Sequence, residues 1–385
     1  PVSHWRARTL LLYITLRHTL ATHIQKLYPQ FSYNNSRVML SAIFLFCASC
    51  AAMPSAKQET TEQQPQGLTS ANMSYAPAVH LLGNQHAQRF LTALLETVKG
   101  DWDDAVTGRG GYKPSNGFCD TCFSMSGTVK LNLVVWALIK TLSVPGDFAE
   151  TGTWRGGTAI VARATQRVLG EDRRRRTYVC DSFEGLPTAT TSEDSEKWNK
   201  MNALRVSVDQ VADNFEAFGL LDGGVRIVRG YFRYSLPILR RRLIEHKRHL
   251  AVLRGDGDMY ESYLDILYNL YELIPVGGIF ICDDCTLIRE AQRAITEFRT
   301  RHGITDRVHI TGIGMLREGD HTYGLTWWKK TKPVSVDYTW YEKWNATRSL
   351  ERGLIPATKI YGFHESRTLA LQAAARRAAM AVLPQ

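Results

Sequence analysis

The sequence has 385 residues, of which 44% are hydrophobic, so we expect a packed core in one large domain or two smaller ones. The net charge is +10, and part of it comes from the arginine runs at 173–176 and 240–242. No zinc-finger, homeodomain or RNA-recognition signature accompanies these runs, so they predict a solvated surface and no nucleic-acid partner. Seven cysteines, an odd number in so long a chain, argue against a disulfide scaffold.

Residues 1–85 are predicted to be an N-terminal extension. Within it, 38–53 is an apolar run behind Arg37 that is shorter than the ~20 residues that span a bilayer, and it resembles the hydrophobic region of a signal peptide. A short anchor and a buried helix are the alternatives. Residues 54–78 are rich in Gln, Thr and Pro, which indicates a polar linker. A signal or anchor at 38–53 would make the protein secretory or membrane-associated.

A globular domain is predicted from residue 86 to residue 330. Apolar residues at helical spacing mark helices at 86–100 and 127–142, and strand-like segments then alternate with helical ones. The expected strands are 146–152, 176–181, 224–230, 249–256, 277–284, 307–314 and 323–330, with helices at 158–170, 262–274 and 288–303. This alternation predicts an α/β fold with a doubly wound, mostly parallel sheet. Residues 331–385 form a predicted C-terminal extension that ends in an amphipathic helix with no assigned partner.

The first expected strand runs into a glycine-rich turn and a helix, within "GDFAETGTWRGGTAI" at 146–160. Gly152, Gly156 and Gly157 would let the backbone pass close to a ligand or to another element. The spacing is neither the G-x-G-x-x-G of dinucleotide binders nor a P-loop. The carboxylate of Glu150 would repel a pyrophosphate but suits a cationic ligand, such as the ammonium or sulfonium group of S-adenosylmethionine. A plain strand–helix turn is the alternative.

The next expected strand ends in a carboxylate, within "VCDSFEGLP" at 179–187. Asp181 at a strand end could accept hydrogen bonds from both ribose hydroxyls of a nucleoside, and Phe183 could line the adenine. Alone this motif is weak, but its place beside the glycine-rich turn favours a nucleoside-type ligand.

Two further expected strands end in pairs of carboxylates: Asp256 and Asp258, then Asp283 and Asp284. Carboxylates crowded at neighbouring strand ends raise each other's pKa, and a divalent cation would relieve this repulsion. Oxygen ligands favour Mg²⁺, Mn²⁺ or Ca²⁺ over zinc. Separate carboxylates that cap separate helices are the alternative.

The stretch "IFICDDC" at 279–285 holds both a carboxylate pair and a C-x-x-C. Cys282 and Cys285 could join Cys119 and Cys122 in a zinc site, but about 160 residues separate the two pairs, far more than in a zinc ribbon. We expect Cys282 to pack as a small hydrophobic residue at the end of a buried strand. The C-x-x-C is then incidental, and the carboxylates are the functional groups.

These motifs in this order resemble the macrocin O-methyltransferase family. The likeness covers about residues 120–330 and rests on "SMSGTVKLNLVVWAL", "VPGDFAETGTWRGG", "CDSFEGLP", "VRGYFRYSLP", "DGDMYES" and "GGIFICDD". It implies a Rossmann-like class I methyltransferase sheet with helices on both faces. It also implies an S-adenosylmethionine- and metal-dependent O-methyltransferase that acts on a hydroxyl of a sugar or glycosylated natural product. A cytoplasmic location and a homo-oligomer are typical of the family.

The resemblance also assigns roles to single residues. Asp258 would be the general base, and Asp256, Asp283 and Asp284 would ligate Mg²⁺ or Mn²⁺. The S-adenosylmethionine pocket would be formed by Glu150, Thr151, Gly152, Arg155, Gly157, Asp181, Ser182, Phe183, Tyr231 and Phe232. The family more often has Trp in place of Tyr231, beside the cofactor. It usually has an aromatic residue in place of Cys285, so we expect differences on the acceptor side.

Other functions are consistent with the same residues. The acceptor could be catechol-like or a glycan, and residues 188–205 are predicted to form a substrate loop. A catalytically inactive binding module is a further alternative, although the intact set of carboxylates argues against it. A nucleic-acid methyltransferase is disfavoured because neither an "NPPY"-type motif nor a cysteine-nucleophile motif is present.

Overall fold

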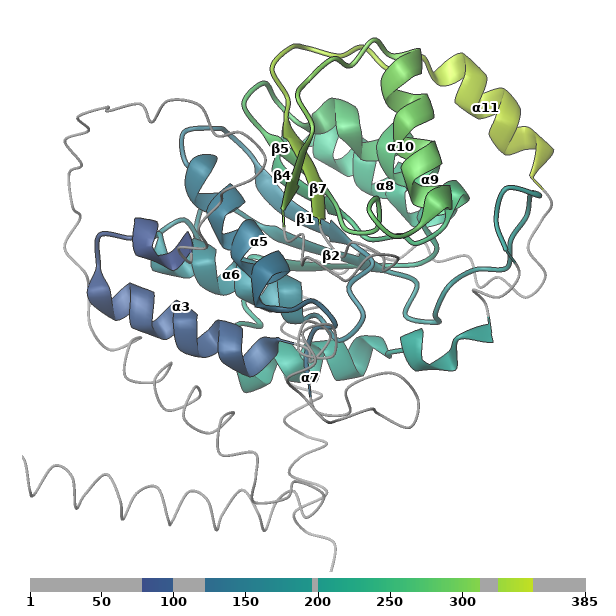
Figure 1. Ribbon diagram of the computed structural model, residues 1–385. Helices are drawn as coiled ribbons and strands as arrows, with labels where there is room; N and C mark the ends of the chain where they lie inside the picture. The colour runs from purple at the N-terminus through teal and green to yellow at the C-terminus, as the bar shows by residue number, and fades with distance from the viewer. Residues whose placement is uncertain (1–77, 100–121, 196–199, 312–324, 349–385) are drawn as a thin grey trace, which may run out of the picture.

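A seven-stranded sheet forms the centre of the computed structural model, which describes residues 78–99, 122–195, 200–311 and 325–348. The strand order is β3-β2-β1-β4-β5-β7-β6, and Figure 1 labels β2, β1, β4, β5 and β7 at the centre of the molecule. The first five strands in this order are parallel, and β7 is antiparallel to both of its neighbours. The strands are β1 (Asp147–Thr151), β2 (Thr177–Asp181), β3 (Val225–Arg229), β4 (Leu250–Gly255), β5 (Ile279–Cys282), β6 (His309–Thr311) and β7 (Leu325–Lys329).

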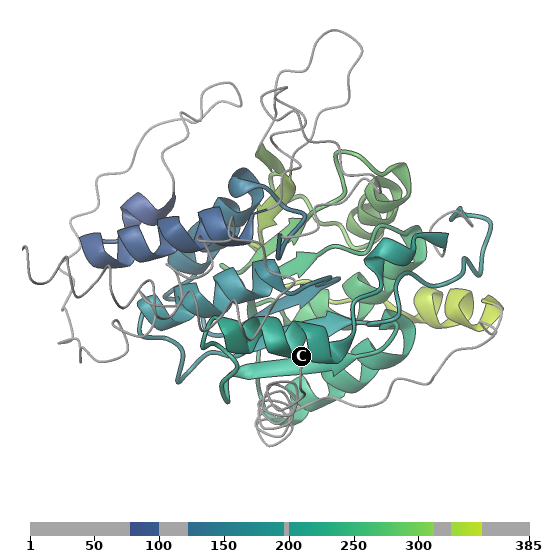
Figure 2. The same cartoon turned by 90° about the horizontal axis from the view of Figure 1, so that it is seen from below.

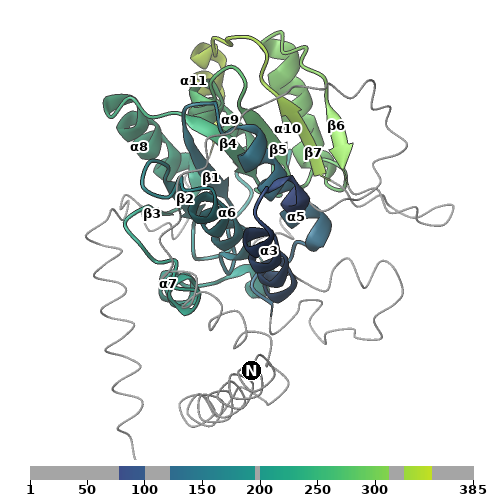
Figure 3. The same ribbon diagram turned by 90° about the vertical axis from the view of Figure 1, so that its left-hand side faces the viewer.

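Helices cover both faces of this sheet (Figure 3). One hydrophobic cluster includes buried residues of α3 (Gln85–Val98), α5 (Thr128–Lys140), α6 (Gly157–Val168) and α7 (Val208–Ala217). The other includes residues of α8 (Phe232–Glu245), α9 (Tyr260–Leu270), α10 (Arg289–Arg301) and α11 (Tyr338–Thr347). Short 3₁₀ helices are η2 (Ala78–Leu81), η4 (Asn202–Leu204) and η5 (Tyr271–Leu273). In Figure 2, the blue α3 and the yellow α11 lie at opposite ends of the molecule.

The strand register determines which residues meet at the edge of the sheet. Glu150 on β1 lies opposite Arg254 on β4, and Gly255 on β4 lies opposite Cys282 on β5. Because the carboxyl ends of parallel strands share one edge, the loops after β1, β2, β4 and β5 converge there. The central strands are buried on both faces, so a charged residue within them needs a buried partner.

The structure confirms the predicted doubly wound, mostly parallel sheet and its strands, with small changes at their ends. The helices α7, α8 and α11 were not predicted from the sequence. In α8 the buried stripe of Leu236, Leu239 and Leu243 is interrupted by Pro237 and by the arginine run 240–242, which conceals the helical period.

Part of the predicted C-terminal extension packs on the same core as the sheet. Asp337 caps α11 by accepting a hydrogen bond from the Thr339 N–H at 3.0 Å, and Val336 and Tyr341 are buried in the second cluster. Residues 38–53, most of the predicted linker and the terminal amphipathic helix lie outside the described residues. Within the described ranges, no helix is both long and apolar enough to cross a membrane.

Candidate active site

The turn between β1 and α6 is packed so closely against other elements that it requires glycine. Gly152 has a φ of +86°, and a Cβ there would lie 1.7 Å from the carbonyl oxygen of Asp256. A Cβ on Gly157 would lie 2.5 Å from the carbonyl oxygen of Phe123. The close approach expected of these glycines is therefore made to the loop after β4 and to the segment before α5.

Asp181, at the end of β2, holds this turn in place. Its Oδ2 accepts hydrogen bonds from the N–H groups of Thr153 at 2.8 Å and Trp154 at 3.1 Å, and its Oδ1 accepts one from the Phe183 N–H at 2.8 Å. Burial raises the pKa of Asp181, and these amides oppose the rise. The carboxylate therefore organises two loops as well as lining the cavity that they enclose.

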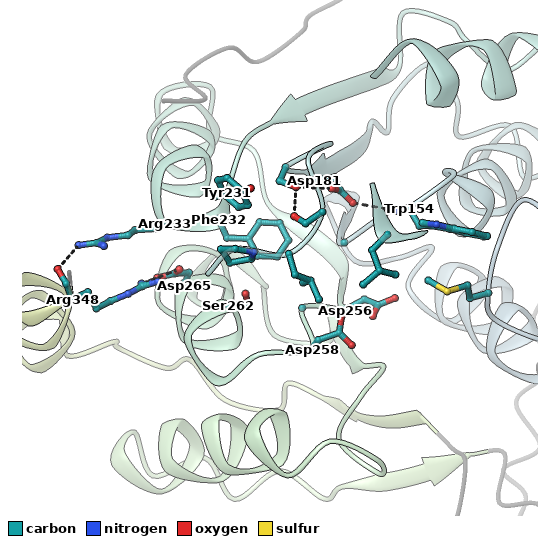
Figure 4. A pocket seen from close by; sticks show the side chains of 18 residues that line it. Trp154, Asp181, Tyr231, Phe232, Arg233, Asp256, Asp258, Ser262, Asp265 and Arg348 are labelled. Atoms are coloured by element: carbon teal, nitrogen blue, oxygen red, sulfur yellow. Dashed lines mark hydrogen bonds and ion pairs between the residues drawn. The ribbon is translucent and has the colours of Figure 1, made fainter. Parts of the chain in front are cut away.

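A cavity lies along the carboxyl ends of β1, β2 and β4 (Figure 4). Trp154 is at one end, Arg233 and Arg348 are at the other, and Asp256 and Asp258 lie between them. Seven of the predicted site residues line it: Gly152, Asp181, Ser182, Tyr231, Phe232, Asp256 and Asp258. Other residues that line the cavity were not predicted, including Met125, Trp154, Arg233, Ser262, Asp265 and Arg348.

Five residues assigned to the cofactor pocket do not line this cavity: Glu150, Thr151, Arg155, Gly157 and Phe183. Glu150 is buried, and its carboxylate accepts a hydrogen bond from Arg254 at 2.6 Å, so its charge is already paired inside the sheet. The guanidinium of Arg155 lies 4.2 Å from the ring centroid of Trp154. Their assignment to the cofactor pocket stays a prediction, since the cavity lining alone does not test it.

Asp256, Asp283 and Asp284 come together at the ends of β4 and β5. One carboxylate oxygen from each lies within 4.8 Å of the other two. Arg254 donates to Asp283 at 2.6 Å and lies 2.9 Å from Asp256, while Lys130 on α5 pairs with Asp283 at 2.8 Å. The three carboxylates are therefore gathered as the sequence analysis expected. We call them the carboxylate cluster.

Asp258 lies on the cavity wall beside this cluster. Its φ of +56° is left-handed, a conformation that Asp and Asn adopt more readily than most residues. Asp284 fixes it, because Asp284 Oδ2 accepts the Asp258 N–H at 3.0 Å and the Tyr263 hydroxyl at 2.8 Å. Burial, with repulsion from Asp256 and Asp283, raises the pKa of Asp258 to about 8.

The carboxylates of the cluster differ in their proton affinity. Burial, with repulsion from Asp258, raises the pKa of Asp284 to about 7. Burial and the neighbouring Asp283 raise the pKa of Asp256 well above its usual value. Burial would also raise the pKa of Asp283, but the cations of Arg254 and of the α5 lysine outweigh it and hold this pKa below the usual value. Asp283 is therefore the carboxylate of the cluster that stays ionised most readily.

The charge balance at this edge suits a bound cation. Five carboxylates face two cations, which gives a net charge of 2 − 5 = −3 when all are ionised: Glu150, Asp256, Asp258, Asp283 and Asp284 against Lys130 and Arg254. A divalent cation would reduce this excess, and the donors are all oxygens, as Mg²⁺ and Mn²⁺ prefer. The residues present thus fit such an ion.

Cys282 and Cys285 form a disulfide, with their Cα atoms 5.8 Å apart. Cys282 is buried in the second hydrophobic cluster at the end of β5, as expected, but it is one half of a disulfide and not the free cysteine that was predicted. The chain turns after β5, where the Leu287 and Ile288 N–H groups donate to the Asp284 carbonyl, and this turn keeps Cys285 beside the strand end. As a disulfide, the pair also provides no thiolates for the zinc site considered from the sequence.

A buried ion network closes the far end of the cavity. Arg348 donates to Asp265 at 2.8 Å and to Glu261 at 2.9 Å, and its side chain is 1% exposed. Glu261 also accepts the N–H of Thr190 at 2.8 Å and thereby anchors part of the predicted substrate loop, 188–205. The network joins α9, the loop after β2 and the segment that follows α11.

Comparisons with known proteins agree with this geometry. A model of the family "Macrocin-O-methyltransferase (TylF)" matches residues 83–315. The chain is 38% identical over 201 residues to the "8-demethyl-8-(2,3-dimethoxy-alpha-L-rhamnosyl)-tetracenomycin-C 4'-O-methyltransferase" of Streptomyces olivaceus, covering 50% of this chain and 74% of that one. It is 37% identical over 194 residues to the "Mycinamicin III 3''-O-methyltransferase" of Micromonospora griseorubida, covering 48% and 73%. The solved structure of the O-methyltransferase NovP matches with a TM-score of 0.53 and 29% identity, over 63% of this chain and 99% of that one.

The sheet order and the cavity at the strand ends define a Rossmann-like class I methyltransferase. The chain belongs to the macrocin O-methyltransferase family, whose model matches well over half of its length. The resemblance inferred from the sequence motifs is thus confirmed, and the protein is a methyltransferase.

Proposed function

We propose that this protein is an S-adenosylmethionine-dependent O-methyltransferase that acts on a sugar hydroxyl of a glycosylated small molecule and uses a divalent cation. One observation carries the proposal: the glycine turn after β1 and Asp258 beside the carboxylate cluster line the same cavity. The names of the relatives support a sugar acceptor, because two of them denote methylation of a rhamnosyl group or of a numbered hydroxyl on a natural product.

The cavity divides into two ends with different proposed ligands. The cofactor would bind at the end formed by Gly152, Asp181 and Ser182, with Tyr231 and Phe232 alongside it. The acceptor would bind at the end lined by Arg233, Asp265 and Arg348, whose hydrogen-bonding side chains suit a hydroxylated group. The acceptor hydroxyl would then lie between the methyl donor and Asp258.

In the proposed reaction, the acceptor oxygen attacks the methyl carbon, the bond from this carbon to sulfur breaks, and Asp258 takes the hydroxyl proton. The products are a methyl ether and S-adenosylhomocysteine. A divalent cation held by Asp256, Asp283 and Asp284 would supply a Lewis acid that lowers the pKa of the acceptor hydroxyl. The cavity residues contribute by holding donor and acceptor in line.

The proposal is tested by incubating the protein with a sugar-containing natural-product extract, Mg²⁺ and S-adenosylmethionine that carries an isotope-labelled methyl group. Mass spectrometry should show labelled methyl ethers whose fragments place the methyl group on a sugar. Label on an aromatic hydroxyl instead would replace the sugar acceptor with a catechol-like one. No product, together with no calorimetric signal for S-adenosylmethionine, would identify an inactive binding module.

Between about pH 6 and pH 8, we expect the affinity for Mn²⁺ to rise about tenfold for each proton that the ion displaces. The pKa values of Asp284 and of the neighbouring Asp258 are raised to about 7 and about 8, and that of the ligand Asp256 is also raised, so these groups hold protons in the ion-free protein at the lower pH. Titration calorimetry in two buffers of different ionisation enthalpy would count the protons released. An affinity independent of pH would contradict these assignments.

The same pKa values predict how the stability of the ion-free protein depends on pH. A carboxyl group whose folded-state pKa is raised stabilises the fold below its unfolded pKa, and this contribution is lost as the pH rises through the folded pKa. The free energy of unfolding should therefore fall as the pH rises from about 4 to about 8, and Mn²⁺ should restore it. Denaturant titrations with and without the ion would measure both effects.

A further inference from the structure

The disulfide encloses two residues of the carboxylate cluster. Cys282 is the last residue of β5, and Cys285 follows Asp283 and Asp284, so the covalent ring passes through both acidic residues. Asp283 also donates its backbone N–H to the Gly255 carbonyl at 2.9 Å, which ties the start of this ring to β4. The geometry of the carboxylate cluster therefore depends on a short segment whose two ends are joined by the disulfide.

One cysteine of this disulfide lines a second cavity. Cys282 is fully buried, whereas Cys285 is 7% exposed and lines a cavity of about 630 Å³ between α10 and the strands β6 and β7. Ile295, Arg299 and Thr326 also line this cavity, which is separate from the one that contains Asp258. The guanidinium of Arg299 adds positive charge there, and this would favour the approach of a thiolate. A reductant could thus reach Cys285 without entering the active site.

We propose that Cys282 and Cys285 form a thiol–disulfide exchange site that sets the affinity of the carboxylate cluster for divalent cations. The inference rests on the proposed function for the ion. The thiolate of a small dithiol attacks Sγ of Cys285, the bond to Sγ of Cys282 breaks, and Cys282 takes up the electron pair and a proton. The second thiol of the reductant then displaces Cys285, so the protein gains two thiols and the reductant becomes a disulfide. A small-molecule disulfide reverses the reaction.

Reduction weakens ion binding because it removes the covalent closure of the segment that carries the ligands. In the disulfide form, the chain between the two cysteines has few conformations, so Asp283 and Asp284 are held in place before the ion binds. In the dithiol form, the same segment must be ordered on binding. Groups that orient metal ligands commonly change the affinity by about tenfold or more, and we expect a loss of about tenfold here.

The test compares the full chain as purified, the same chain treated with dithiothreitol and then desalted without air, and the variant Cys285→Ser. Alkylation and peptide mass spectrometry report the state of the pair, and titration calorimetry reports the affinity for Mn²⁺. The reduced chain should bind Mn²⁺ about tenfold more weakly than the oxidised chain. Cys285→Ser should match the reduced chain and should not respond to dithiothreitol. Cys180→Ser, a change at a buried reduced cysteine on β2, should respond as the parent does.

Three results would overturn the proposal, and they differ from one another. Rapid alkylation of Cys285 in the untreated protein would show that no disulfide forms. Equal Mn²⁺ affinity in the oxidised and reduced chains would show that the disulfide does not control the cluster. If Mn²⁺ binds to neither the oxidised nor the reduced chain, the ion has no part in the proposed function. The proposed coupling between the disulfide and ion binding would then also be wrong.

Discussion

Replacing Asp258 with Asn is expected to lower the turnover number by about two to four orders of magnitude and to leave the affinity for S-adenosylmethionine within about twofold. The substitution removes the proton acceptor but keeps the shape of the side chain. Asn also tolerates the left-handed backbone at this position, and the N–H that donates to Asp284 is unchanged. Single-turnover kinetics with the acceptor from the extract experiment, and calorimetry with the cofactor, would measure the two effects.

The matched control is Asp337→Asn, the same chemical change at an exposed helix cap. Asn caps helices about as well as Asp, so this variant should keep the turnover and stability of the parent. Near-normal turnover in Asp258→Asn would show that another group takes the proton. Loss of cofactor binding in that variant would show instead that Asp258 shapes the cofactor site.

Removal of divalent cations should have the second large effect. EDTA is expected to lower methyl transfer by about a hundredfold or more, because the Lewis acid is worth several kcal/mol. Added Mg²⁺ or Mn²⁺ should restore the rate. Asp284→Asn should weaken Mn²⁺ binding while the chain still binds S-adenosylmethionine, since Asp284 lies in the carboxylate cluster and does not line the cavity.

Circular dichroism and cofactor binding in EDTA provide the controls for this experiment, since both should stay unchanged if the ion acts in catalysis alone. Full activity in EDTA would remove the cation from the mechanism. In that case, the positive charges of Arg254 and Lys130 would be the main partners of the carboxylates.

The positions of the carboxylates could be predicted from the sequence because each follows an apolar strand, and parallel strands end at one edge. Their partners were harder to predict. Arg254 lies inside the buried strand "HLAVLRGD", and a charged residue there requires a buried counter-charge. The sequence does not reveal which carboxylate provides it. Lys130 lies in a predicted helix, where a lysine is ordinarily solvated. The neighbouring sequence therefore does not indicate that it pairs with Asp283.

The residues of the cofactor pocket show a different limit. Motif position predicts that Glu150 and Arg155 face a ligand. It does not reveal that Glu150 accepts a hydrogen bond from Arg254, its neighbour in the strand register, or that the Arg155 guanidinium lies over Trp154. Successive side chains of a β-strand point to opposite faces of the sheet, and the sequence alone does not reveal which face borders the cavity. The disulfide was missed for a similar reason, because it depends on the turn that returns Cys285 to the strand end.

The Arg348 network limits how far the chain can be shortened after the last strand of the sheet. A chain that stopped after Lys330 would keep every strand of the sheet and the whole carboxylate cluster. It would also leave the carboxylates of Glu261 and Asp265 buried without their cation, a loss that commonly costs about 3–5 kcal/mol of stability. A truncation after the last strand would therefore remove part of the cavity wall, and one at the end of the family match would also remove β7, so a useful fragment includes Arg348.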